Sequence, residues 1–146
     1  MIRSVYGLLV LVAVLGLVGC GPSGPSTVPV KGTLTIDGQP ADNVSITLSP
    51  LDSKLPTASG QVKNGAFQLF TGSQGKPGAV PGKYKVVLSQ MQTASPEELK
   101  AMYVKGGGPP PSPKRSFAEK YTQASTSDKE VEVKSGPNDL KIDVAK

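Results

Sequence analysis

The sequence predicts an all-β domain, an antiparallel β-sandwich of seven short strands with one short helix, and three observations lead to this fold. Apolar and polar residues alternate in several short runs, which is the pattern of strands that bury one face. Turn-forming residues separate the runs, since the chain of 146 residues contains 17 glycines and 14 prolines. One long stretch, residues 91–126, departs from the alternation and is expected to be an insertion. Short strands joined by such turns are typical of a sandwich.

The first two strands are expected at residues 28–36 and 44–49. In the first, aliphatic side chains alternate with Lys31 and two threonines, so one face is apolar. In the second, three aliphatic residues alternate with serine and threonine. Asp37-Gly38 lies between the strands and supplies residues that tolerate the positive φ of a turn.

The next two strands are expected at residues 58–62 and 66–70, as a hairpin. Asn64-Gly65 lies between them, and Asn-Gly between apolar runs is the strongest short-range signal for a hairpin. Phe67 and Leu69 occupy alternate positions of the second of these strands. Both are therefore expected to point into the core.

The remaining strands are expected at residues 84–89, 130–133 and 140–144. The first of them follows a glycine-rich loop, residues 71–82, and the last two flank a turn over residues 135–139. The residues expected to point inward again hold alternate positions: Tyr84, Val86, Leu88, Val131, Val133, Leu140, Ile142 and Val144.

The insertion at residues 91–126 contains the signature of a helix N-terminus. Ser95 can cap the helix, Pro96 suits its first position, and Glu98 can reach back to the cap. Residues 106–113 are rich in glycine and proline and fit neither a helix nor a central strand, so a mobile or polyproline segment is expected there.

Three aromatic residues of the insertion form a candidate binding surface, because long connections often carry binding function. Tyr103 lies on one face of the expected helix, and Phe117 and Tyr121 follow the proline-rich segment. The surface requires that all three rings stay exposed. The alternative is that Phe117 and Tyr121 fold back on the edge of the sandwich.

Leu17-Val18-Gly19-Cys20 ends an N-terminal segment that has the form of a secretory signal peptide. Arg3 gives a positive start, and residues 5–18 are almost entirely apolar. The motif resembles the lipobox of bacterial lipoproteins, in which the cysteine thiol receives a diacylglyceryl group and the chain is cut just before the cysteine. The resemblance implies cleavage between Gly19 and Cys20 and a covalent lipid on Cys20.

Two alternatives to a lipid anchor have less support. A transmembrane helix needs about 20 apolar residues to span a bilayer, and the apolar run at residues 5–18 is shorter. A secreted protein cut elsewhere would keep an unpaired thiol, since the chain contains a single cysteine.

The position of Cys20 also gives the domain organisation. Residues 1–19 are the signal peptide, residues 20–27 a lipidated flexible tether, and residues 28–146 one β-domain. Gly21 follows the cysteine, whereas an aspartate there is the best-known signal for retention in the inner membrane. The resemblance therefore implies an exported protein, lipid-anchored in the cell envelope at the outer membrane.

Composition excludes several classes of function. The net charge is +5, but the lysines are scattered, which indicates a solvated surface and argues against a nucleic-acid partner. The chain has no histidine, and its one thiol is expected to carry the lipid. A Ser/His or Cys/His nucleophile is thereby excluded, so the domain is predicted to be non-catalytic. No metal and no cofactor other than the lipid on Cys20 is expected.

Two groups of residues could form an isopeptide bond or a calcium site, and simple turns explain both groups better. Lys31 and Asn138 lie near the first and last strands, where collagen-adhesin repeats, a related sandwich, form an isopeptide bond. Lys31 is predicted to point outward, however, so an exposed lysine and a turn asparagine are expected instead. Asp37, Asp42 and Asn43 carry oxygens that calcium favours, although a turn explains Asp37 better.

Two longer motifs carry a resemblance to a known family. Val30-Lys31-Gly32-Thr33-Leu34-Thr35-Ile36-Asp37-Gly38-Gln39-Pro40 resembles the opening of carboxypeptidase regulatory-like domains, and Val80-Pro81-Gly82-Lys83-Tyr84-Lys85-Val86 is similar to a second signature of these domains. With the lipobox, the chain resembles short lipoproteins of planctomycete-type bacteria. The resemblance implies a transthyretin-like (prealbumin-like) sandwich of seven strands. It implies no enzyme activity, because the motifs are structural.

Two hypotheses for function follow. The first is a membrane-anchored binding or scaffolding module that presents loops, particularly residues 71–82 and 91–126, to an envelope protein or glycan. The second is a structural envelope spacer without a specific ligand. A binding module is expected to expose an apolar or aromatic patch near the insertion, whereas a spacer is expected to be uniformly polar.

Overall fold

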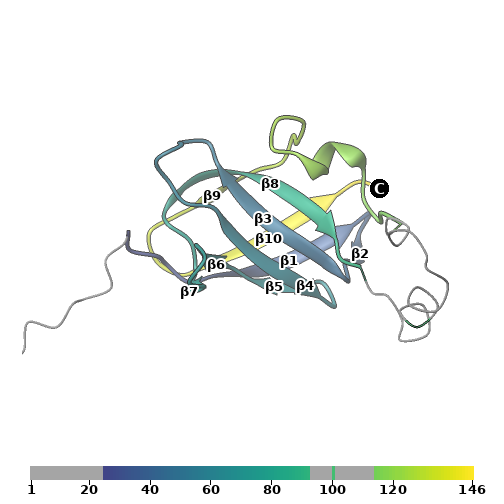
Figure 1. The fold of residues 1–146 in the computed structure, drawn as a ribbon, viewed down its shortest axis with the longest axis horizontal. Coiled ribbons are helices and arrows are strands. Elements are labelled where there is room, and N and C mark those ends of the chain that lie inside the picture. The colour runs from purple at the N-terminus through teal and green to yellow at the C-terminus, as the bar shows by residue number, and fades with distance from the viewer. Residues whose placement is uncertain (1–24, 93–99, 101–113) are drawn as a thin grey trace, which may run out of the picture.

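The computed structural model describes residues 25–92, 100 and 114–146, and the strands of these residues form one curled, open sheet (Figure 1). The predicted signal peptide, most of the predicted tether, Tyr103, and most of the predicted helix and proline-rich segment lie outside the described residues. One 3-10 helix, η1, spans Glu119–Thr122. The strands are β1 Val30–Ile36, β2 Gln39–Pro40, β3 Val44–Pro50, β4 Ala58–Lys63, β5 Ala66–Gln68, β6 Phe70–Thr71, β7 Lys76–Pro77, β8 Gly82–Gln90, β9 Glu130–Val133 and β10 Asn138–Val144.

The short connection between the two edge strands explains why the sheet curls. Hydrogen-bonded strands follow the order β10-β1-β5-β4-β3-β8-β9, so β10 and β9 lie at opposite edges, yet only residues 134–137 join them. An extended chain spans at most about 3.6 Å per residue, whereas strands in a flat sheet lie about 4.8 Å apart. The connection cannot cross a flat sheet of this width. The edges therefore approach each other, and β10 passes behind β3 in Figure 1.

The side chain of Asn138 closes the connection between β9 and β10. Its carboxamide oxygen accepts a hydrogen bond from the Lys134 amide at 2.9 Å, and its nitrogen donates to the carbonyls of Lys134 and Gly136 at 2.8 and 2.7 Å. Asn138 is therefore the turn asparagine that the sequence predicts. Lys31 is exposed on the outer face of β1, also as predicted.

β10 pairs with β1 in parallel, from Val30↔Asn138 to Ile36↔Val144, whereas the other pairs in the described sheet are antiparallel. The prediction of a wholly antiparallel arrangement is wrong for this pair. β9 runs antiparallel to β8 and returns the chain to the end of the sheet at which β1 begins. β10 must then start beside the start of β1 and run in the same direction.

Hydrogen bonds at the far end of β10 tie it to the turn after β1. The Thr35 hydroxyl and the Gly38 amide both donate to the carboxylate of Asp143. The Thr35 hydroxyl, and then the Gly38 amide, hold the pKa of Asp143 below its ordinary value.

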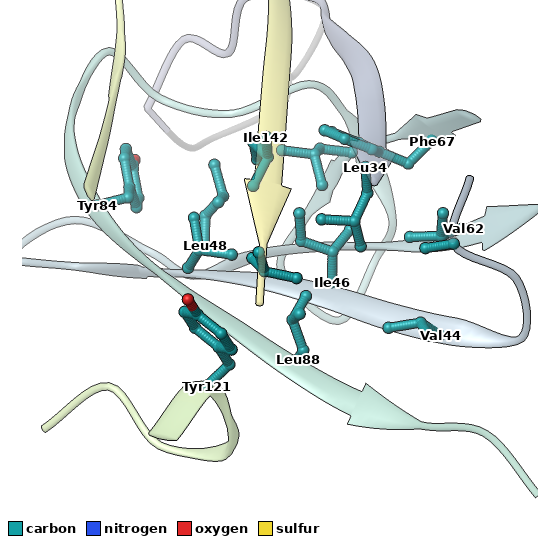
Figure 2. Close-up of a cluster of buried hydrophobic side chains, with 14 of the residues drawn as sticks. Leu34, Val44, Ile46, Leu48, Val62, Phe67, Tyr84, Leu88, Tyr121 and Ile142 are labelled. Atoms are coloured by element: carbon teal, nitrogen blue, oxygen red, sulfur yellow. The ribbon is translucent and has the colours of Figure 1, made fainter. Parts of the chain in front are cut away.

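Alternate residues of the strands point into the curl and form the core (Figure 2). Ile142 of β10 lies in the same buried cluster as Leu34 of β1 and Leu48 of β3. A fully buried aliphatic side chain contributes about 1.5–3 kcal/mol, so this interior stabilises the curl. Most residues predicted to point inward are buried: Val30, Leu34, Ile36, Val44, Ile46, Leu48, Phe67, Leu69, Tyr84, Val86, Leu88, Val133, Ile142 and Val144. Val131 and Leu140, also predicted to point inward, are only partly buried and pack against this core.

The segment after residue 113 covers one side of this core. Tyr121 of η1 is 2 % exposed and points toward the core side chains of β3 and β8 in Figure 2. The Lys120 ammonium lies 5.0 Å from the centre of the Tyr121 ring, on the side away from the fully buried core. The Ser127 hydroxyl donates to the Val86 carbonyl at 2.6 Å and fixes the segment to β8.

The all-β prediction is confirmed, and so are its two principal turns. Asp37-Gly38 has φ values of 50° and 76°, and Asn64-Gly65 has 50° and 78°, which is the left-handed region that these residues tolerate. The two-residue strands β2 and β7 fall in segments for which the sequence predicts a turn and a loop, and β6 continues from the last residue of the predicted strand 66–70 into the predicted loop.

Gly32 lies where three parts of the sheet approach most closely. A Cβ atom at Gly32 would be 2.1 Å from the Leu140 carbonyl oxygen of β10 and 2.7 Å from Cζ of Phe67. Both distances are far inside van der Waals contact, so only glycine allows β10 and the Phe67 ring to lie against β1 together.

We therefore expect Gly32→Ala to lower the free energy of unfolding by about 3 kcal/mol, the upper part of the usual cost of overpacking. Urea denaturation of the variant and of the parent chain measures this difference. Thr33→Ala, at the exposed neighbouring position, should change stability by less than about 0.5 kcal/mol. Equal stability of Gly32→Ala and the parent would contradict the described approach of β10 to β1.

Candidate functional site

A groove of about 730 Å³ crosses the outer face of β1, β5 and β4 and extends to the β6–β7 hairpin. Small residues leave this face hollow. Ala66, an outward residue with a short side chain, lies between Thr33 and Lys63 across the strands, and Gly72 and Gly75 add no side chains at the hairpin end. The lining residues are Lys31, Ser59, Gly60, Gln61, Lys63, Ala66, Phe67, Gln68, Phe70, Gly72, Ser73 and Gly75.

Strand pairing brings polar side chains of different strands together in the groove. Lys31 of β1 lies opposite Gln68 of β5. Directly opposed residues on one face of a sheet have Cβ atoms about 4.5–5.5 Å apart, so Lys31 and Gln68 can contact one ligand. Ser59, Gln61 and Lys63 take alternate, exposed positions along β4 and continue the polar lining. The groove therefore offers both hydrogen-bond donors and acceptors.

The β6–β7 hairpin positions an exposed aromatic ring beside these polar groups. Phe70 pairs with Pro77 across the hairpin and is 38 % exposed. The neighbouring side chain, Thr71, points inward, and its hydroxyl donates to the Gly78 carbonyl at 2.7 Å. Because strand residues alternate between faces, the buried Thr71 fixes Phe70 on the groove side.

The electrostatic character of the groove is cationic. Lys31 and Lys63 line it, and among the residues that the structure describes no carboxylate does. Ion pairs lie elsewhere: Lys85–Glu130, Arg115–Glu119 and Lys120–Asp128 in the described residues. Hydrogen bonds from Lys120 and Lys85 hold the pKa values of Asp128 and Glu130 below their ordinary range, so these acids offset lysines outside the groove.

The candidate binding residues of the insertion are not brought together at an exposed surface. Phe117 is 4 % and Tyr121 is 2 % exposed, and both belong to the core cluster. They fold back on the sheet, the alternative that the sequence left open, because the curled sheet needs apolar cover beside β8. Their rings are therefore unavailable for stacking on a ligand. Tyr103, Gly19 and Cys20 lie outside the described residues.

The two loops proposed to present a ligand site lie at opposite ends of the sheet. Residues 71–82 lie at the end of the sheet where β1 begins. Residues 92 and 114 flank the undescribed part of the insertion. They lie at the opposite end of the sheet, near the last residues of β8. Only residues 71–82 contribute to the groove, through Gly72, Ser73 and Gly75.

Sequence reasoning missed Phe70 as a surface residue, although the signal was present. Phe70 is two residues after Gln68, which points outward, so Phe70 is expected on the same outer face. Phe67 and Leu69, on either side of Gln68, point inward. An aromatic residue at an outward position of a strand is the signal that could have identified it.

The oxygen ligands considered for calcium make hydrogen bonds within the turns. Asp42 accepts from the Asn64 amide at 3.2 Å and from the Asn43 side chain at 3.3 Å, and Asp37 accepts from the Lys146 amide at 3.3 Å. Within residues 25–92, 100 and 114–146, no group of three or more acidic, cysteine or histidine side chains is arranged to hold a metal ion.

Comparison of the chain with models of known protein families, with curated proteins and with solved structures found no match. Among the described residues, no helix combines the length and the apolar character that a membrane span requires. The function is therefore inferred from the groove and its residues.

The hydroxyl of Thr71 should be needed for the hairpin that holds Phe70. Thr71→Val keeps the side-chain shape but leaves the buried Gly78 carbonyl without its donor, so we expect a loss of about 1–2 kcal/mol in the free energy of unfolding. Thermal or urea denaturation measures the loss. Thr57→Val, at an exposed position of the neighbouring loop, is the matched control and should change stability by less than about 0.5 kcal/mol. Equal effects of the two variants would contradict a structural role for the Thr71 hydroxyl.

Proposed function

We propose that this chain is a lipid-anchored protein of the cell envelope whose β-domain is a non-catalytic binding module, with the groove over β1, β5 and β4 as its binding surface. The anchor rests on the N-terminal sequence, in which an apolar run ends at Leu17-Val18-Gly19-Cys20. The absence of histidine from the chain supports a non-catalytic role.

The composition of the groove is the observation that carries the proposal. Phe70 offers a flat apolar face, Gln61 and Gln68 offer planar amides that donate and accept, and Lys31 and Lys63 offer positive charge. A sugar ring has one apolar face and a rim of hydroxyl groups that donate and accept hydrogen bonds. A glycan is therefore the ligand class that fits best, and the two lysines without a lining carboxylate favour one that bears acidic groups.

The remainder of the described surface argues against a large apolar partner. Leu51 and Phe70 are the large hydrophobic residues that stand exposed in the described part of the chain. Two separate side chains do not make the contiguous patch of several hundred Å² that marks an apolar protein interface. A polar ligand is consistent with this surface.

We also propose that the curled sheet is a variant of the transthyretin-like fold. Two motif residues have roles that support this assignment. Gly32 of the first motif accommodates the Phe67 ring, and Tyr84 of the second donates a hydrogen bond from its buried hydroxyl to the Val80 carbonyl at 2.7 Å. Burial raises the pKa of Tyr84, which keeps this hydroxyl protonated as a donor.

A structural spacer is the second candidate, and the polar outer faces of β1 and β4 favour it. The alternating burial of β1 and β4 leaves lysine, threonine, serine and glutamine outward. A spacer requires no ligand contact, so substitution of the groove side chains would not impair its function. The following experiment separates the two candidates.

We expect Phe70→Ala to weaken binding of the chain to an acidic polysaccharide, such as a uronic-acid polymer, by at least about tenfold. Phe70→Tyr keeps the ring and should retain binding. Exchange of Lys31 and Lys63 for glutamine should weaken binding and reduce its dependence on salt, whereas the same exchange at Lys114 and Lys146 should not. Titration calorimetry with the acidic polymer and with a neutral one measures these effects. Absence of binding to either polymer would favour the spacer.

Lipidation of Cys20 has its own test. The mass of the protein purified from its membrane should correspond to a chain beginning at Cys20 with a diacylglyceryl group attached. Cys20→Ser should abolish the modification and the firm association with membrane, because about 0.8 kcal/mol is lost for each methylene that leaves the bilayer. A native chain with an unmodified thiol would overturn the anchor without affecting the groove.

A further inference from the structure

The end of the sheet at which the described chain begins is the end nearest the proposed anchor. We call it the entry end, and it consists of residues 25–29, 50–57, 70–82 and 134–138. Val28 exchanges backbone hydrogen bonds with Ala79 at 2.8 and 3.0 Å, and the Lys76 ammonium donates to the Pro25 carbonyl at 3.2 Å. These bonds hold the base of the tether against the β6–β7 hairpin. Figure 1 shows the described chain beginning, in purple, close to β6 and β7.

A second cleft, of about 610 Å³, opens at the entry end between the β3–β4 loop and the β6–β7 hairpin. Lys54 lies on the loop side, Lys76 lies on the hairpin side, and Thr27 and Ser53 add hydroxyl groups. No carboxylate of the described residues lines the cleft. The carboxylate of Asp52 accepts a hydrogen bond from the Lys54 amide at 3.0 Å, so it shapes the loop.

An exposed leucine lies beside this cationic cleft. Leu51 is 51 % exposed, and its amide donates to the Lys83 carbonyl at 3.0 Å, which fixes it at the edge of the entry end. Lys83 is itself exposed. At a membrane surface, exposed lysines can interact with anionic headgroups, and a neighbouring apolar side chain can insert among the upper parts of the acyl chains.

The length of the tether sets how far this end can be from the membrane. Five residue steps separate Cys20 from Pro25, and an extended chain covers at most about 3.6 Å per step, or about 18 Å in total. The acyl chains of a lipidated Cys20 would hold that residue at headgroup depth. Electrostatic attraction between the lysines and anionic headgroups falls off over about 8 Å at physiological ionic strength. A tether that is modestly shorter than its full extension therefore places Lys54 and Lys76 within this distance of the headgroups.

We propose that the entry end docks on the anionic phospholipid surface of the membrane that holds the anchor, with lipid phosphate in the cleft between Lys54 and Lys76 and Leu51 at the interface. The proposal rests on the lipid anchor of the proposed function. Docking orients the sheet relative to the membrane. The other end of the sheet, which holds residues 92 and 114, then lies about 20 Å farther from the membrane than the entry end, because a seven-residue strand has about this length. The groove on the outer face of β1, β5 and β4 opens to the side.

The single cysteine allows docking to be tested without the natural lipid. A chain of residues 20–146 is coupled through the Cys20 thiol to a maleimide lipid in vesicles of phosphatidylcholine, either alone or with about 30 % phosphatidylglycerol. Hydrogen exchange measured by mass spectrometry then compares residues 51–57 and 72–76 with residues 37–43 at the other end. We expect exchange of the two entry-end loops to slow at least about threefold on the anionic vesicles only, and residues 37–43 to be unaffected.

Matched variants decide whether the entry end is responsible. Lys54→Glu with Lys76→Glu should abolish the slowing, whereas Lys114→Glu with Lys146→Glu changes the net charge equally at the other end and should preserve it. Lys54→Glu alone leaves the Lys76 bond to Pro25 intact and should reduce the slowing, which excludes a folding defect as the cause. A salt concentration of about 0.5 M should remove the effect.

Three results would overturn the proposal: equal exchange on neutral and anionic vesicles, equal loss of the effect in both double variants, or slowing at residues 37–43 instead. Chemical coupling supplies the anchor in every case. Failure of docking is therefore distinguishable from failure of lipidation, which the mass of the native protein reports separately.

Discussion

β10 lies beside β1 in parallel over its full length, from Val30↔Asn138 to Ile36↔Val144, and the arrangement of the domain depends on this pairing. It places the last strand at one edge of the sheet while β9, a few residues earlier in the chain, stays at the other edge. The short link between them then forces the sheet to curl, and the curl encloses the aliphatic side chains that stabilise it. Gly32 permits the pairing, because any larger residue would meet the Leu140 carbonyl.

The groove is a consequence of the same curl. Once one face of the sheet encloses the core, every second residue of β1, β4 and β5 must face outward. Lysine, glutamine, serine and threonine at most of these positions make the face polar, and the short side chain of Ala66 leaves it hollow. Phe70 reaches this face because Thr71, the next residue, is held inside by its hydrogen bond to Gly78. Packing on the inner face thus determines which side chains a ligand in the groove would contact.

The two ends of the sheet differ in chemistry as well as in position. The end where the chain enters carries lysines around a cleft without a lining carboxylate, and it lies within a short tether of the proposed anchor. The other end carries Asp37, Asp42 and Asp143 among its turn residues, and their carboxylates accept hydrogen bonds there. Charges of both signs lie at each end, with Asp52 and Asp139 at the first and Lys63 and Lys146 at the second. The proposed attraction to anionic lipids therefore rests on the cleft between Lys54 and Lys76. The proposed groove and the proposed docking cleft adjoin each other, since Gly72 and Ser73 line both.

The sequence by itself determined the local features of this protein. Alternation predicted the seven main strands and their inward residues, and Asp37-Gly38 and Asn64-Gly65 predicted the turns with positive φ, because these preferences reside in a few neighbouring residues. The tertiary structure alone decided the parallel direction of β10, the burial of Phe117 and Tyr121, and the exposure of Phe70 beside Lys31 and Gln68. Each of these depends on contacts between residues far apart in the chain. Their free energy depends on which strands become neighbours, and the periodicity of a single strand does not specify its neighbours.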